Sequence, residues 1–246
     1  MARRAAGGAS RLSRTAIGDG AEGLTADERV ERSKLLYEQA VFTGDGGPLD
    51  AADRELDAAE AGLVLARGKV AHGRFLVALD QDAGPPAEDP AELALFERAA
   101  ELYRSLGDER GEAAALFWAG CFQQVVRRDD GTAVPLLERS LELARRVRDE
   151  ETMAEALRHL GIAAHRAGRL DEAADRLEES CQLRRAAGQP ASVAANLVGL
   201  AYVAAGQGRQ DEAGERLAEA DRLAAGAGAH RVRRHVAEAR ATLLPQ

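Results

Sequence analysis

The chain of 246 residues is dominated by Ala, Leu, Glu, Asp and Arg, and its aromatic residues amount to only 4%. This bias toward strong helix formers favours an all-α fold, and a hydrophobic content of 46% excludes a wholly disordered chain. The formal net charge of −8 argues against a surface for duplex nucleic acid, because such a surface needs clustered Lys and Arg side chains.

Residues 1–24 are small, Gly-rich and basic, and we predict that they form a disordered tail. No apolar segment follows Arg3 and Arg4, so the sequence predicts no secretory signal. No apolar run approaches the roughly 20 residues that span a membrane. Cys121 and Cys181 cannot supply a disulfide framework, and both are expected to be buried thiols. We therefore expect a cytoplasmic protein with no membrane partner.

From residue 25 onward, the spacing of apolar residues predicts one helical-repeat domain that runs to residue 246. Thr25, followed by Asp27-Glu28, is typical of a capped helix start. Gly84-Pro85-Pro86 cannot continue a helix and should form a protruding loop. The predicted helical hairpins cover residues 25–61, 63–106, 110–147, 150–187 and 190–225, and a capping helix covers residues 229–244.

The chain contains an internal repeat. Residues 157–183 match residues 197–223 at an offset of 40 residues, with Gly168 and Leu177 among the positions that recur. A further copy relates residues 95–109 to residues 136–150 at an offset of 41. A single helical hairpin cannot bury both of its apolar faces, whereas stacked hairpins can, so the repeat predicts a solenoid.

Each copy places apolar and small residues at fixed positions. In one hairpin these are Leu157, Leu160-Gly161, Ala173, Leu177 and Ser180. This pattern resembles the tetratricopeptide repeat. The resemblance implies an all-α, right-handed α-solenoid of about five hairpins plus the capping helix. The long period is similar to that of helical repeats in large bacterial transcriptional regulators.

The sequence offers no spacing that indicates catalysis or a cofactor. The five histidines are scattered without the i, i+4 spacing of a helical metal pair, so we predict no metal site. Cys121 and His165 are a conceivable nucleophile and base, but nothing in the sequence orients them, and a packed thiol is the better interpretation. The pair Asp171-Glu172 recurs 40 residues later, which favours helix caps over catalytic carboxylates. We therefore predict a protein that is not an enzyme and needs no cofactor.

The resemblance implies that the first helix of each hairpin lines a concave inner face. These positions differ between copies, as in a surface shaped for one ligand, although an unconstrained surface or core packing would also account for them. A groove with Arg side chains suits a peptide with an acidic or C-terminal carboxylate group. The predicted groove residues are Lys69, His72, Phe117, Gln124, Arg158, Ile162, His165 and Tyr202.

The leading hypothesis for function is a scaffold or adaptor that binds a protein or peptide and does not bind nucleic acid directly. An alternative is a ligand- or peptide-sensing module that acts on transcription through another protein. An enzyme on a helical scaffold is the third and weakest hypothesis. The sequence leaves open whether the chain is a monomer or a homodimer.

Overall fold

The computed structural model describes residues 23–79 and 86–244, and within these ranges the only regular secondary structure is helix. The predicted disordered tail lies outside the described residues except for positions 23 and 24, as does most of the predicted Gly-Pro-Pro loop. The described helices are α1 Ala26–Thr43, α2 Gly47–Leu79, α3 Glu92–Leu106, α4 Glu109–Val125, α5 Asp130–Arg146, α6 Glu150–Arg166, α7 Leu170–Ala186, α8 Pro190–Gly206, α9 Gln210–Gly226 and α10 His230–Leu243.

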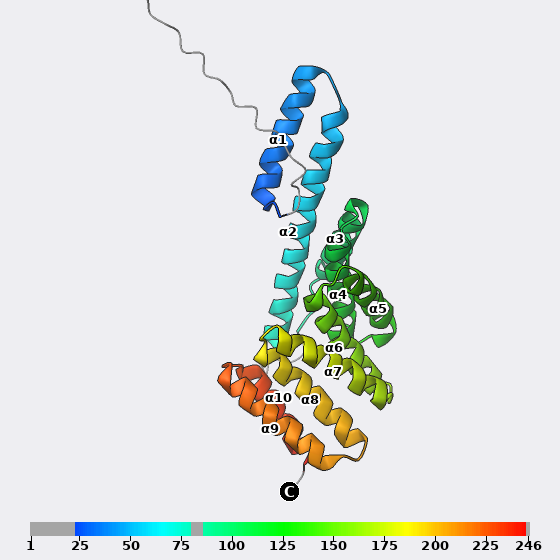
Figure 1. Cartoon of the computed structure of the whole chain (residues 1–246), viewed down its shortest axis with the longest axis vertical. Coiled ribbons are helices and arrows are strands. Elements are labelled where there is room, and N and C mark those ends of the chain that lie inside the picture. The colour runs from blue at the N-terminus through cyan, green and yellow to red at the C-terminus, as the bar shows by residue number, and fades with distance from the viewer. Residues whose placement is uncertain (1–22, 80–85, 245–246) are drawn as a thin grey trace, which may run out of the picture.

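The helices stack in chain order as an α-solenoid (Figure 1). The helices α4, α6 and α8 each pair with the helix that follows, and α5, α7 and α9 also contact the next pair. Direct contacts link α2 to α4, α4 to α6, α6 to α8 and α8 to α10, so these five form a continuous layer that we call the inner helices. The prediction of an all-α solenoid is confirmed.

The predicted break between the first two hairpins, near residue 62, is wrong. The helix α2 runs unbroken through Gly62, with α1 beside its first half and α3 against its second half. The neighbours of Gly62 are strong helix formers, and one Gly inside a helix costs only about 1 kcal/mol relative to Ala. The hairpin of α1 and α2 therefore extends beyond the rest of the molecule (Figure 1).

The turns between repeats use a left-handed residue. Gly168, Gly188 and Gly208 have φ of 76°, 66° and 78°, which confirms that Gly ends these helices. The prediction that Asp171 caps the next helix is wrong, because α7 already begins at Leu170. Asp171 lies in the first turn, where its charge stabilises the positive end of the helix dipole. Thr25, by contrast, forms the predicted capping box with Glu28.

Close contacts between paired helices depend on small residues. A Cβ atom on Gly161 would lie 2.8 Å from the Cγ atom of Leu177, and one on Gly120 would lie 2.8 Å from that of Leu137. The Ser180 hydroxyl donates a hydrogen bond of 2.6 Å to the carbonyl of Ala154 in the paired helix. These positions hold α4 on α5 and α6 on α7 at short range, as the repeat pattern predicts.

Candidate functional site

The predicted groove residues occupy matched positions on successive inner helices. Phe117 of α4 corresponds to Arg158 of α6, and Gln124 corresponds to His165, at the offset of 41 residues. Ile162 of α6 corresponds to Tyr202 of α8 at the offset of 40. The structure therefore brings most of the predicted set onto one continuous face.

Three members of the set are not exposed as predicted. His72, Phe117 and Gln124 are only 2%, 3% and 1% exposed. They are buried because α2 and α6 flank α4 and both place side chains over it. The ring of Phe117, for example, lies 5.4 Å from that of His159 on α6, and 5.1 Å from that of Trp118 on α4 itself.

The other five keep some access to solvent. Lys69 is exposed, and its ammonium lies 5.4 Å from the centroid of the Trp118 ring. Arg158, Ile162, His165 and Tyr202 are half-buried. Contact between these five side chains and a partner stays a prediction.

A chain of polar side chains, buried except for the half-buried His159, crosses the inner helices. The Sγ atom of Cys121 lies between two imidazoles, 3.6 Å from Nε2 of His72 and 3.8 Å from Nε2 of His159. On one side, Nδ1 of His72 lies 2.7 Å from Oε1 of Glu92. On the other, Nδ1 of His159 lies 2.6 Å from Oε1 of Gln124. These contacts tie α2, α3, α4 and α6 together, and we call the five residues the buried polar chain.

Burial favours the uncharged form of each titratable member of the buried polar chain. Desolvation, with a smaller contribution from Asp89 and Glu88, raises the pKa of Glu92 to about 7. Desolvation lowers the pKa of His72 to about 4 and that of His159 to about 3, and nearby Arg side chains add to both shifts. Burial also raises the pKa of the Cys121 thiol.

With these protonation states, the hydrogen bonds can all run in one direction. Protonated Glu92 donates to Nδ1 of His72, whose Nε2–H then donates to the sulfur of Cys121. The thiol donates to Nε2 of His159, whose Nδ1–H donates to Gln124. The Gln124 amide ends the run by donating to Asp130 at 2.9 Å. These tautomers are assigned from the network, because each imidazole and the thiol then has one donor and one acceptor. Oε2 of Glu92 has no partner among the described residues, and the Gln124 amide also donates to the carbonyl of His159.

The buried polar chain resembles a nucleophile with its base and orienting acid, but its chemistry is that of a structural element. A nucleophilic cysteine needs a thiolate and access to a substrate, whereas Cys121 is a neutral thiol that is 4% exposed. The imagined pairing of Cys121 with His165 is wrong, because His72 and His159 surround the thiol. The described residues also contain no group of three or more His, Cys, Asp or Glu side chains arranged to hold a metal ion.

Acid should destabilise the fold through His159. Its pKa is about 3 in the folded chain and near 6.5 when unfolded, so the unfolded state binds an extra proton between these values. The contribution of His159 to the free energy of unfolding should be complete above pH 6.5. It should fall by about 1.4 kcal/mol per pH unit between pH 6.5 and pH 3. The shifts of His72 and Glu92 are opposite in sign and offset each other between about pH 4.5 and 6.5.

Urea unfolding of wild type and His159→Asn at several pH values tests this prediction. Asn keeps an N–H near the Nδ1 position but does not titrate, so the variant should lose the extra pH slope. Equal slopes for both proteins would contradict the assignment.

A second polar link joins α6 to α8. An Nη1–H of Arg158 donates to Oδ1 of Asn196 at 2.9 Å, and the Asn196 amide donates to Oγ of Ser180 at 2.8 Å. Asn196 and Ser180 are fully buried, so each depends on these bonds. Further along the same face, the rings of His165 and Tyr202 are 6.3 Å apart and T-shaped.

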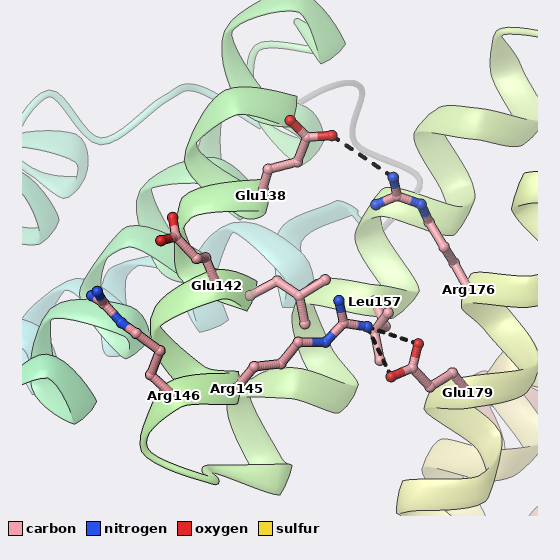
Figure 2. A pocket seen from close by; sticks show the side chains of 8 residues that line it. Glu138, Glu142, Arg145, Arg146, Leu157, Arg176 and Glu179 are labelled. Carbon is pink, nitrogen blue, oxygen red and sulfur yellow. Dashed lines mark hydrogen bonds and ion pairs between the residues drawn. The ribbon is translucent and has the colours of Figure 1, made fainter.

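The opposite, outer side of the solenoid carries a hollow of about 610 Å³ between α5 and α7 (Figure 2). Its charged groups already pair across it: Arg145 lies 2.9 Å from Glu179, and Arg176 lies 3.7 Å from Glu138. These pairs bridge the walls of the hollow, so they leave fewer free charges to recognise a ligand.

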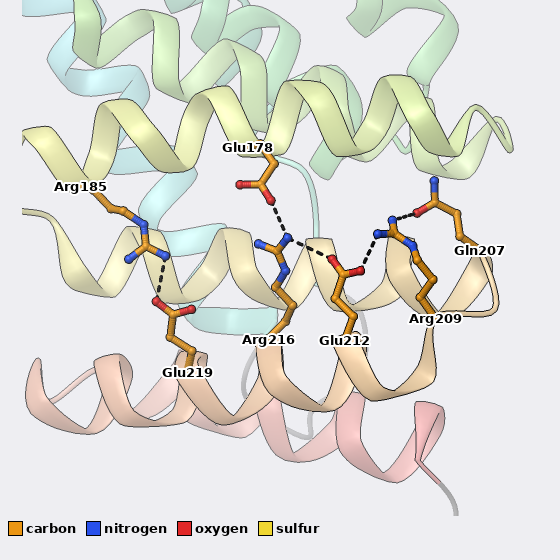
Figure 3. Close-up of polar contacts among 7 residues, drawn as sticks. All are labelled: Glu178, Arg185, Gln207, Arg209, Glu212, Arg216 and Glu219. Carbon is orange, nitrogen blue, oxygen red and sulfur yellow. Dashed lines mark hydrogen bonds and ion pairs between the residues drawn. The ribbon is translucent and has the colours of Figure 1, made fainter.

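The same ion pairs recur one repeat later (Figure 3). Arg185 pairs with Glu219 at 2.8 Å, and Arg216 lies 2.6 Å from Glu178 and 3.1 Å from Glu212. These recurring ion pairs form a ladder along the outer side of the solenoid. They could be predicted from the sequence, because Arg176, Glu172 and Glu179 recur 40 residues later. The ladder is a repeated structural feature, so the repeat itself does not identify a binding site.

Similarity to known proteins is found in the repeated part of the chain. A family model described as tetratricopeptide repeat matches residues 127–186, the segment that contains α5, α6 and α7. A similar solved structure is BtubC (BKLC) from P. vanneervenii, with 17% sequence identity and a TM-score of 0.45, covering 83% of this chain and 91% of that chain. No curated protein gives a match.

The repeat type suggests a protein-interaction scaffold, a role that is typically non-catalytic. No helix in the described part of the chain is both long and apolar enough to cross a membrane. The helix pairing seen in the matched segment continues through α8 and α9, with Leu200-Ala201 and Leu217 at the corresponding positions. Residues 127–186 therefore carry a helical repeat of the tetratricopeptide type, and the described helices on either side continue the same stacking.

Proposed function

We propose that this chain is a scaffold that binds a protein or peptide partner on the inner face of α6 and α8. The observation that carries the proposal is the group of half-buried side chains Arg158, Ile162, His165 and Tyr202 on these two neighbouring helices. Partly buried aromatic and Arg side chains are the types that dominate binding energy at protein interfaces. Their positions vary between repeats while the packing positions stay alike.

The chemistry of this face favours a carboxylate on the partner. A guanidinium has five N–H donors, and Arg158 uses one of them on the neutral amide of Asn196. Lys69 contributes a second positive charge on the inner helices, and Arg231 of α10 is close enough to lower the pKa of His72. We propose that a free C-terminus or an acidic side chain docks beside Arg158.

Arg158→Ala is a poor test of this proposal, because it also removes the donor to the buried Asn196 and should lower stability. Arg158→Lys keeps the charge and one possible donor but loses the planar fork that grips a carboxylate with two bonds. Arg145→Lys, on the outer hollow, is the matched control.

The experiment screens short synthetic peptides with free or amidated C-termini by fluorescence anisotropy. For the peptides selected by wild type, we expect Arg158→Lys and Tyr202→Ser to weaken binding by about tenfold or more, which corresponds to about 1.4 kcal/mol. Arg145→Lys should bind as wild type does. Equal binding by wild type, Arg158→Lys and Tyr202→Ser would contradict the proposed site.

A further inference from the structure

The long helix α2 carries an apolar stripe that nothing in the described chain covers. Large side chains recur every seventh residue, and each is between 42% and 61% exposed. A heptad spacing keeps these residues on one side of a helix, with a drift of only about 20° per heptad. The stripe consists of Leu49, Leu56, Leu63, Val70 and Val77.

The stripe faces away from the inner helices. His72, whose imidazole lies in the buried polar chain, is nine residues from Leu63, which is two and a half helical turns and thus the opposite side of α2. In Figure 1, α3 lies beside only one side of the lower half of α2. The stripe is therefore an outer surface, separate from the proposed peptide site.

The residues between the stripe positions are suited to close helix packing. Three residues after each of the first four stripe residues comes a small one: Ala52, which is buried in the chain's own fold, and Ala59, Ala66 and Gly73, which keep access to solvent. Large and small residues alternating at the two apolar heptad positions let a second helix approach closely. The stripe is about 42 Å long and on the order of 10 Å wide, which gives on the order of 400 Å². The largest apolar patch on a typical monomer is about 300–600 Å², and such a patch is often functional.

Charges beside the stripe select the partner. The residue four positions after each stripe residue is acidic in the first half of α2, at Asp53 and Glu60, and basic in the second half, at Arg67 and Arg74. A second α2 in the antiparallel direction, centred on Leu63, would place Asp53 near Arg74 of the other copy and Glu60 near its Arg67. Charges at these flanking heptad positions set partner choice and orientation.

We infer that α2 forms an antiparallel coiled coil with the α2 helix of a second copy of this chain, so that the protein is a homodimer. Two stripes bury on the order of 800 Å² in total, and the flanking charged side chains bring the interface toward the lower bound of roughly 1,000 Å² for a biological interface. Glu60 also accepts from Nε of Arg98 at 2.8 Å in its own chain, and a carboxylate has capacity for further donors.

Sedimentation velocity of the full chain at micromolar concentration tests the dimer. Wild type should have twice the 26.1 kDa mass of the chain, and Leu63→Glu/Val70→Glu should have the single mass. Arg54→Glu, also nine residues from Leu63 and thus on the far side of α2, should remain dimeric. Circular dichroism checks that both variants keep their helices. The inference would be overturned if wild type were monomeric, even if it paired with a different protein. It would also be overturned if the dimer survived the double substitution.

A charge exchange tests the antiparallel orientation. Arg67→Glu/Arg74→Glu places acid opposite acid, and Asp53→Arg/Glu60→Arg places base opposite base, so each variant alone should dimerise at least tenfold more weakly than wild type. An equimolar mixture restores both opposite-charge pairs and should form a dimer with one copy of each. Failure of the mixture to dimerise would overturn the orientation.

Discussion

Gly161→Val should lower the free energy of unfolding by about 2–4 kcal/mol, as overpacking of a tight core contact does. A Cβ atom at this position would lie 2.8 Å from Cγ of Leu177, which is itself 1% exposed and cannot swing into solvent. The two γ-methyl groups of Val add to this clash, so α6 and α7 must move apart. Urea denaturation followed by circular dichroism measures the loss.

Two matched substitutions separate the clash from helix propensity. Gly161→Ala brings the same Cβ against Leu177 but no γ-methyl groups, so it should cost less than Val. A gain of up to about 1 kcal/mol of helix propensity offsets part of this cost, and the next repeat has Ala201 at the same position. Gly226→Val places the same side chain in a helix where no atom lies within 4 Å of its Cβ, and it should cost nothing. A similar loss for Gly161→Val and Gly226→Val would contradict the packing argument.

The repeat positions were predictable because their physical role is the same in each copy. The close approach at Gly161 and the Ser180 hydrogen bond recur, as Gly120 and Ser140 show, and a repeated requirement leaves a repeated residue. The continuous α2 was not predictable from the repeat, since the first half of this helix pairs with α1 outside the regular stack. Nothing local marks the difference between a helix that ends at Gly62 and one that continues.

The buried polar chain was missed for another reason. His72 and Glu92 are 20 residues apart and meet Cys121 only because α2 and α3 stack on α4. A sequence pattern shows which side of an inner helix faces inward, but not whether neighbouring helices cover that side. For this reason His72, Phe117 and Gln124 were predicted as lining and are found inside.

Gln124→Leu should be the most damaging single change in the buried polar chain, lowering stability by about 2–5 kcal/mol. The amide accepts from His159 Nδ1–H at 2.6 Å and donates to the His159 carbonyl at 3.1 Å and to Asp130 at 2.9 Å. Leu has a similar volume but leaves the His159 groups without these partners, and each stranded buried group costs about 1–3 kcal/mol. Asp130 loses less, because Arg166 still donates to it.

A double-mutant cycle shows whether this loss comes from stranded polar groups or from a changed shape. Gln124→Leu/His159→Phe removes the imidazole N–H together with its acceptor, and such paired replacement is often nearly neutral. The double variant should therefore be more stable than the sum of the two single losses predicts, by at least about 1 kcal/mol. Additive losses would mean that Gln124 and His159 act independently. Non-additive losses would instead mean that Gln124 and His159 together hold α4 against α6. The relative position of these two inner helices shapes the face around Arg158.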